Sequence, residues 1–214
     1  MLLYYITNRK GFQGNESEQR LALFKRIAEA SRAGLDYIQL REKDLSIVDL
    51  ELLAREALHI IRENSATTKF LINSHNDVAL ATGADGVHLP AGSAPASVVR
   101  AAWCDCGSRV PVIGVSAHNF ADVQRAEGEG ADFAVLAPIF EKAGTAVRGT
   151  GLAKLGEACS ESRLPVLALG GVNLTNARAC LDAGAAGLAG IRLFQQGDIA
   201  ETLRRLREFS AATR

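Results

Sequence analysis

The sequence predicts an α/β chain folded as a single-domain (β/α)8 barrel, the TIM-barrel architecture, over residues 1–214. Eight short apolar runs alternate with longer amphipathic segments along the whole chain, and no Pro- or Ser-rich linker interrupts them. The runs show little polar alternation, as expected for parallel strands that helices cover. A length of 214 residues lies at the small end of the range for such barrels.

The expected elements follow one another in a regular order. Strands are predicted at residues 2–7, 37–40, 70–72, 86–88, 112–115, 133–136, 166–169 and 187–190. Helical spacing of apolar residues predicts helices that include 16–33, 47–63, 119–130, 173–183 and 198–211. In the second helix the apolar face is expected to include Val48, Leu52, Leu53, Ala57 and Ile60. Glycine-containing turns at 33–34, 83–86, 130–132 and 184–187 are typical helix ends.

An open doubly wound sheet is the alternative fold. The turn after residues 2–7 lacks the G-x-G-x-x-G of a dinucleotide site, which favours the barrel.

The composition excludes several classes of function. The chain has 24 basic and 24 acidic side chains, so it carries no charge excess for nucleic acid or an anionic membrane. No recognisable secretion signal and no apolar run of about 18 residues is present, so a cytoplasmic location is expected. Cys104 and Cys106 lie too close together, without a second Cys or His pair, to predict a zinc site.

Functional groups of a barrel are expected where its strands end. Gln39, Arg41 and Lys43 alternate at the end of the second strand, so their side chains should share one face. Two adjacent cations favour an anionic ligand, and Arg suits phosphate or carboxylate. A surface salt-bridge set with Glu42 and Asp44 is the alternative interpretation.

Glycine-containing turns follow the last two strands. Gly170 and Gly171 come after the seventh, and Gly190, Ile191 and Arg192 end the eighth. Barrels frequently bind phosphate here, because glycine lets backbone N–H groups approach the oxygens closely. Tight turns without a ligand are the alternative.

Other polar residues complete the predicted rim. His118 follows the fifth strand and could move a proton near neutral pH. Asn73 and Ser116, at the ends of the third and fifth strands, are candidate ligand contacts. His88 is expected to be a packed, hydrogen-bonded residue.

Residues 141–151 form the longest irregular segment after a strand and are rich in glycine and small polar residues. A mobile lid is the functional interpretation, with Lys142 and Arg148 adding positive charge. A surface insertion is the alternative.

Several motifs in order resemble the thiamine-phosphate synthase/TenI superfamily. They are YYITN at 4–8, QLREK at 39–43, LIN at 71–73, ADGVHL at 84–89, GVSAH at 114–118, GAD at 130–132, PIF at 138–140 and ALGGV at 168–172. The resemblance implies a phosphate-binding barrel that acts on a phosphorylated thiazole in thiamine biosynthesis. Since such enzymes are often dimers, it also implies a possible homodimer.

Synthases of this superfamily join a pyrimidine diphosphate to a thiazole phosphate, using Mg²⁺ held by two aspartates. At the matching positions this sequence has Ser74 and Ser93. Mg²⁺ relies on one or two carboxylates plus substrate phosphates, and serine supplies no charge. The Thr-x-Thr-Lys pattern of the synthase lid is also absent after Phe140.

The resemblance therefore favours a TenI-like thiazole tautomerase that needs no cofactor or metal. His118 matches the histidine of those enzymes and is the expected general acid and base, and Arg41 and Lys43 are expected near the substrate carboxylate. A divergent synthase that binds Mg²⁺ through phosphate oxygens and Asn73 remains an alternative. A non-catalytic binder of thiazole or thiamine phosphate is another.

Overall fold

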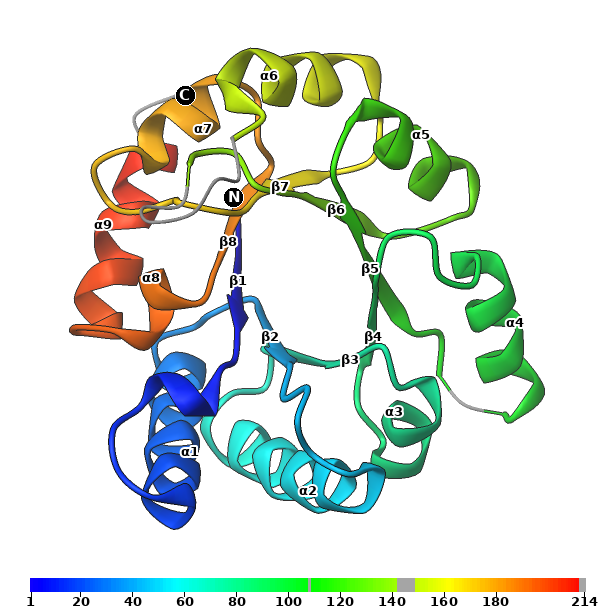
Figure 1. Ribbon diagram of the computed structural model, residues 1–214, viewed down its shortest axis with the longest axis vertical. Coiled ribbons are helices and arrows are strands. Elements are labelled where there is room, and N and C mark those ends of the chain that lie inside the picture. Colours follow the sequence, from blue (N-terminus) through cyan, green and yellow to red (C-terminus); the bar gives the residue numbers. More distant parts are fainter. Residues whose placement is uncertain (108, 142–148, 212–214) are drawn as a thin grey trace.

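The computed structural model describes residues 1–107, 109–141 and 149–211, and it contains a closed barrel of eight parallel strands (Figure 1). Each strand pairs with the next in sequence, and β8 closes the ring on β1. The strands are β1 (Leu2–Ile6), β2 (Tyr37–Leu40), β3 (Lys69–Asn73), β4 (Gly86–Leu89), β5 (Val112–Ala117), β6 (Phe133–Leu136), β7 (Val166–Ala168) and β8 (Gly187–Gly190). The predicted (β/α)8 fold is confirmed, and the strand boundaries differ from the predicted ones by two residues at most.

Helices surround this ring (Figure 1). They are α1 (Glu16–Arg32), α2 (Ile47–Asn64), α3 (Asn76–Thr82), α4 (Ala96–Asp105), α5 (Phe120–Gly128), α6 (Gly151–Glu161), α7 (Ala177–Asp182), α8 (Arg192–Gln195) and α9 (Ile199–Ala211), with a 3-10 turn η1 (Arg9–Gly11) after β1. In the described part of the chain, no helix combines the length and the apolar character that crossing a membrane requires.

The helix predicted at 173–183 begins later, at Ala177. The Asn173 side chain explains the delay, since its Oδ1 accepts hydrogen bonds from the N–H groups of Thr175 and Asn176. This local turn competes with the first helical turn.

The buried face of α2 also differs from the expected one. Its buried residues are Leu50, Leu53, Ala54, Ala57 and Ile61. By contrast, Val48 and Leu52 are 69% and 60% exposed. The helical period was predicted correctly, but α2 packs beside α1 and α3, and these contacts rotate its buried face away from Val48 and Leu52.

Large apolar side chains fill the inside of the barrel. Tyr4, Phe133 and Tyr37 pack with ring centroids 5.2–5.9 Å apart. The remaining buried members of this inner cluster are Ile6, Leu71, Val135, Leu167 and Ala189. Because successive side chains on a strand point to opposite faces, Leu3 and Tyr5 instead join the larger core between strands and helices. The barrel is therefore a packed core below its rim.

Gly114 makes room for this core, and substituting alanine should test its role. A Cβ on Gly114 would lie 2.5 Å from the Phe133 ring and 2.9 Å from His88 Nδ1. Because both rings are buried, we expect Gly114→Ala to lower the free energy of unfolding by about 1–3 kcal/mol in urea denaturation. Gly128→Ala is the control, since a Cβ there meets nothing within 4 Å. It should be neutral or stabilising by up to about 1 kcal/mol. Equal effects of the two substitutions would contradict the close packing at Gly114.

Candidate functional site

The predicted site residues gather at the carboxyl end of the barrel, because parallel strands place all their carboxyl ends on one side. Gln39 is on β2, Asn73 ends β3, Ser116 is on β5 and Gly190 ends β8, while the other candidates follow β2, β5, β7 and β8 directly. The structure thus brings residues from positions 39 to 192 to one rim. Closer contacts are seen only within smaller groups of them.

The first group lies at the ends of β2 and β3. Gln39 is buried, and its Nε2 donates a long, 3.5 Å hydrogen bond to Asn73 Oδ1. Asn73 Nδ2 donates in turn to Ser74 Oγ at 2.8 Å. A cavity of about 260 Å³ beside them is lined by Leu40, Glu42, Lys43, Leu50, Asn73, Ser74 and His75. Lys43 and Asn73, both predicted ligand contacts, therefore line one hollow.

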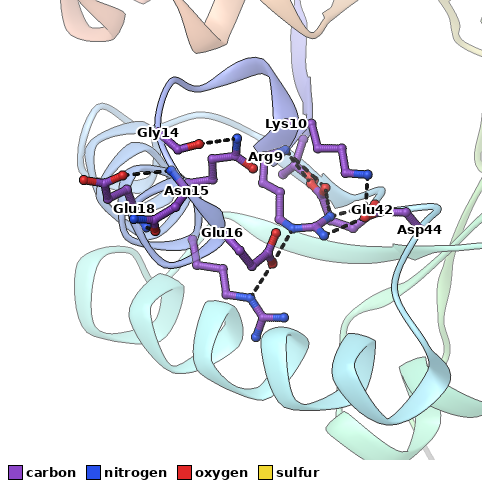
Figure 2. A network of polar contacts seen from close by, with 11 residues as sticks. Arg9, Lys10, Gly14, Asn15, Glu16, Glu18, Glu42 and Asp44 are labelled. Atoms are coloured by element: carbon purple, nitrogen blue, oxygen red, sulfur yellow. Dashed lines mark hydrogen bonds and ion pairs between the residues drawn. The ribbon is translucent and has the colours of Figure 1, made fainter.

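A buried arginine organises the loops after β1 and β2 (Figure 2). Only 2% of the Arg9 side chain is exposed. Its two terminal nitrogens donate to both Asp44 oxygens at 2.7 Å, its Nε donates to Glu16 at 2.9 Å, and its Nη1 donates to Glu42 at 3.1 Å. Figure 2 shows the three carboxylates converging on this one guanidinium. The hydrogen bonds from Arg9 hold the pKa of Asp44 well below its usual value and lower that of Glu16.

Both carboxylate oxygens of Glu42 accept hydrogen bonds within this network. Its Oε1 accepts from Thr7 Oγ1 at 2.7 Å, and both its oxygens accept from the Arg9 backbone N–H at 3.1 Å. Asp44 also pairs with Lys10 at 2.9 Å. The alternative in which Glu42 and Asp44 neutralise Arg41 and Lys43 is therefore wrong.

Arg41 and Lys43 keep their charge available at the rim. Within the described residues, no ion pair involves Arg41, Lys43 or Arg192. The Arg41 backbone N–H is held by Thr7 Oγ1 at 3.0 Å, and its charge is felt by the buried His88 ring. This arrangement suits an anionic ligand, as predicted for the pair.

His88 is packed inside the barrel, as the sequence predicts. It is 4% exposed, its Nδ1 lies 3.2 Å from Tyr4 Oη, and its Nε2 lies 2.9 Å from Ser116 Oγ. Burial, with a smaller contribution from the positive charge of Arg41, lowers the pKa of His88 to about 3. The ring is therefore neutral near pH 7, and Ser116 is the rim residue to which it connects.

His118 is exposed at the end of β5. Its Nδ1 lies 3.0 Å from the Ala137 carbonyl oxygen, and its backbone N–H donates to Asp122 Oδ2 at 2.9 Å. A carbonyl can only accept, so Nδ1 carries the hydrogen and the neutral ring has its lone pair on Nε2. This orientation leaves Nε2 able to accept a proton.

The turn after β7 is built by close backbone contacts. Gly170 and Gly171 have φ values of 94° and 68°, in the left-handed region that favours glycine. A Cβ on Gly170 would lie 2.7 Å from Pro138, and one on Gly171 would lie 2.7 Å from Phe140 Cβ. Both glycines thus have a structural reason, so the glycine pair alone does not establish a phosphate site.

Hydrogen bonds join the turn after β8 to residues near the start of the chain. Gln195 in α8 accepts from Tyr5 Oη at 3.2 Å and donates to the Asn8 carbonyl at 2.8 Å. Arg192, the first residue of α8, is exposed. This turn adjoins β1, and Gly190 pairs with Tyr5 across the ring closure.

The predicted lid at 141–151 is described only at its ends. The backbone N–H groups of Thr150 and Gly151 donate to the carbonyls of Pro138 and Ile139 at 2.8 and 2.9 Å. These bonds hold the last residues of the segment against the residues that follow β6. Residues 142–148, including Lys142 and Arg148, lie outside the described residues, so the lid stays a prediction.

No role was predicted for Arg9 or His75, and Glu42 was treated only as a surface salt-bridge partner. His75 lines the cavity beside Ser74. The one available signal was the alternation at 39–44, which puts Glu42 and Asp44 on the face opposite Arg41. Nothing local identifies Arg9 as their partner, because it lies 33 residues before Glu42.

Comparisons with known proteins agree with this architecture. The profile of a family described as thiamine monophosphate synthase, TMP-TENI, matches residues 3–194. A "Putative thiamine-phosphate synthase 2" of Aquifex aeolicus is 38% identical over 90% of this chain and 96% of its own. A "Thiamine-phosphate synthase" of Coprothermobacter proteolyticus is 35% identical over 96% of this chain and 93% of its own. Among solved structures, thiamine phosphate pyrophosphorylase from Pyrococcus furiosus superposes with a TM-score of 0.80 at 28% identity, covering 99% of this chain and 96% of that one.

Proposed function

Because the chain belongs to the thiamine monophosphate synthase family, TMP-TENI, we propose that this enzyme of thiamine biosynthesis acts on a phosphorylated thiazole by moving a proton. The proposed reaction is that of a thiazole tautomerase, which converts a non-aromatic thiazole carboxylate phosphate into its aromatic isomer. The observation that carries this choice is the set of side chains at the ends of β3 and β4, where serines stand in place of carboxylates.

These side chains do not fit a magnesium ion. Ser74 and Ser93 supply uncharged hydroxyls, and the Asn73 side chain is hydrogen-bonded to Gln39 and Ser74. Glu42, the carboxylate beside the cavity, is bound by Arg9 and Thr7. No cluster of three or more His, Cys, Asp or Glu within residues 1–107, 109–141 and 149–211 could hold a metal ion. The proposed reaction therefore includes no step on Mg²⁺.

The proposed proton shift needs one base that also serves as the acid. His118 Nε2 would take a proton from one atom of the non-aromatic ring and return it to another while the ring electrons rearrange. No group leaves and the composition of the substrate does not change. The hydrogen bond from Nδ1 to Ala137 supports this role, because in the neutral ring it places the hydrogen on Nδ1 and leaves the lone pair of Nε2 free to accept a proton.

The two ends of the substrate would be held by different parts of the rim. The carboxylate is assigned to the cations Arg41 and Lys43, with Gln39, Asn73 and Ser116 as polar contacts. The phosphate is assigned to the adjacent turns of β7 and β8, which contain Gly170, Gly171, Gly190, Ile191 and Arg192. Holding both ends would orient the ring against His118.

A thiamine-phosphate synthase is the second candidate, and the names of the relatives favour it over the tautomerase. Relatives at 35–38% identity bear the synthase name, qualified as putative for the one from Aquifex aeolicus. In that reaction a thiazole nitrogen would attack a pyrimidine methylene carbon and displace diphosphate. Arg41 and Lys43 would then bind the departing diphosphate.

Two assays on the purified protein separate these functions. We expect catalytic conversion of the non-aromatic thiazole carboxylate phosphate to the aromatic isomer in EDTA, followed by NMR. We also expect no thiamine phosphate from the pyrimidine diphosphate and thiazole phosphate, with or without Mg²⁺. Magnesium-stimulated formation of thiamine phosphate would establish the synthase instead. Binding without turnover in either assay would also overturn the tautomerase and indicate a non-catalytic binder.

A further inference from the structure

A chain of three hydrogen-bonding side chains runs from inside the barrel to its rim. Tyr4 on β1 is fully buried, His88 on β4 is 4% exposed, and Ser116 on β5 is half-buried. Tyr4 Oη lies 3.2 Å from His88 Nδ1, and His88 Nε2 lies 2.9 Å from Ser116 Oγ. Only Ser116 is on the rim, so the two buried residues are outside the machinery assigned above.

The directions of these hydrogen bonds can be derived from what each group can donate. The Tyr4 hydroxyl carries one hydrogen, and among the described residues His88 Nδ1 is the one hydrogen-bond partner of its side chain. If Nδ1 carried a hydrogen, the Tyr4 hydrogen would be buried without an acceptor, at a cost of about 1–3 kcal/mol. Tyr4 Oη therefore donates to a bare Nδ1, and the hydrogen of the neutral ring is on Nε2.

This protonation state fixes the role of Ser116. His88 Nε2–H donates to Ser116 Oγ, so the serine accepts a hydrogen bond from inside the barrel. Its own hydrogen cannot point to the same nitrogen and must point elsewhere. Because Ser116 is half-buried at the rim, its hydroxyl hydrogen can point toward the rim.

We propose that Tyr4 and His88 are positioning residues that make Ser116 a dedicated hydrogen-bond donor to an acceptor oxygen of the bound substrate, its carboxylate or phosphate. The identity of the ligand rests on the proposed function. The direction of the hydrogen bonds in the relay, by which we mean the series Tyr4, His88 and Ser116, does not depend on it. In this role Ser116 is a donor and neither a base nor a nucleophile, since no group draws its proton inward.

The residues around His88 favour its neutral ring. Gly114 pairs with His88 across β4 and β5, and a Cβ there would lie 2.9 Å from Nδ1, so the glycine leaves space for the ring. The Phe133 and Tyr4 rings pack around the His88 ring, with centroids 6.5 and 5.7 Å from its centroid. This apolar wall and Arg41 disfavour the charged ring, which would donate from both nitrogens.

The first test measures the relay without any ligand. In the ¹⁵N-labelled protein, ring nitrogen shifts should show His88 with hydrogen on Nε2 and none on Nδ1. Its signals are assigned against spectra of His59→Gln, His75→Gln and His118→Gln. Tyr4→Phe removes the donor to Nδ1 and should yield a mixture of both tautomers. Tyr5→Phe is the matched control, since Tyr5 is an adjacent buried tyrosine whose hydroxyl bonds to Gln195. It should leave the His88 signals unchanged.

The second test measures binding of the aromatic thiazole carboxylate phosphate by calorimetry. Tyr4→Phe and Ser116→Ala should each raise Kd about 3- to 10-fold, because one hydrogen bond is weakened or lost. Added to Ser116→Ala, Tyr4→Phe should have no further effect, since both act through one hydroxyl. Tyr5→Phe should leave Kd within about twofold.

The outcomes separate this inference from the proposed function. Hydrogen on Nδ1 in the unmodified protein overturns the relay, as does an unchanged His88 tautomer and Kd in Tyr4→Phe. Independent effects of Tyr4→Phe and Ser116→Ala on Kd overturn the positioning role. If the thiazole phosphate binds to no form while His88 has the expected tautomer, the proposed function fails and, with it, the assignment of the Ser116 donor to that ligand.

Discussion

Replacing Arg9 with methionine is expected to lower the free energy of unfolding by about 3–5 kcal/mol, measured by urea denaturation. The substitution keeps most of the side-chain volume but removes the charge that binds Glu16, Glu42 and Asp44. Glu42 is 2% exposed, so it would keep a buried negative charge whose remaining donors among the described residues are Thr7 Oγ1 and a backbone N–H. An uncompensated buried charge is the main source of the loss.

Arg204→Met provides the matched control. Arg204 also bonds to two carboxylates, Glu201 and Glu208, but its side chain is 58% exposed. Exposed pairs contribute little, so its loss should change stability by less than about 1 kcal/mol. Adding Glu42→Gln to Arg9→Met should restore part of the stability, because it removes the unpaired charge. Similar losses for Arg9→Met and Arg204→Met would contradict a buried network.

His118→Gln is expected to lower the turnover of the proposed tautomerase by about 10²- to 10⁴-fold with little change in Kd for the aromatic product. Glutamine can donate to the Ala137 carbonyl as Nδ1 does, but it cannot accept and return a proton near pH 7. Turnover would be measured with the non-aromatic substrate, and Kd by calorimetry.

His59→Gln is the corresponding control, since His59 is an exposed residue of α2 paired with Glu63. Its turnover should remain within twofold of the unmodified enzyme. If His118→Gln keeps more than a tenth of the turnover, His118 is not the general acid and base. A large increase in Kd would instead indicate that it serves in binding.

Much of the fold could be predicted because it depends on local patterns. The eight apolar runs became the eight strands, and His118 and Asn73 lie at strand ends as expected. The buried face of α2 could not be predicted, since either Val48 or Leu50 fits helical spacing. Packing of α2 beside α1 and α3 decides between them by burying Leu50 and leaving Val48 exposed.

The sequence predicted which residues lie at the rim better than it predicted the ion pairs and hydrogen bonds between them. Arg41 and Lys43 follow β2 at the rim as expected, but Glu42 and Asp44 pair with Arg9 rather than with them. Likewise, a packed His88 was expected, but its partner Tyr4 lies 84 residues away. Such pairs join residues that the barrel brings together from distant parts of the sequence, and no local pattern encodes them.

The sequence by itself determined the order of strands and helices, the glycine turns between them and the serines where a magnesium site would need carboxylates. Only the tertiary structure decided which carboxylate binds which cation and which nitrogen of His88 carries the hydrogen. The physical reason is that apolar periodicity reports whether a residue is buried, whereas a buried polar group needs a specific partner. In this barrel those partners come from strands that are distant in sequence and adjacent in space.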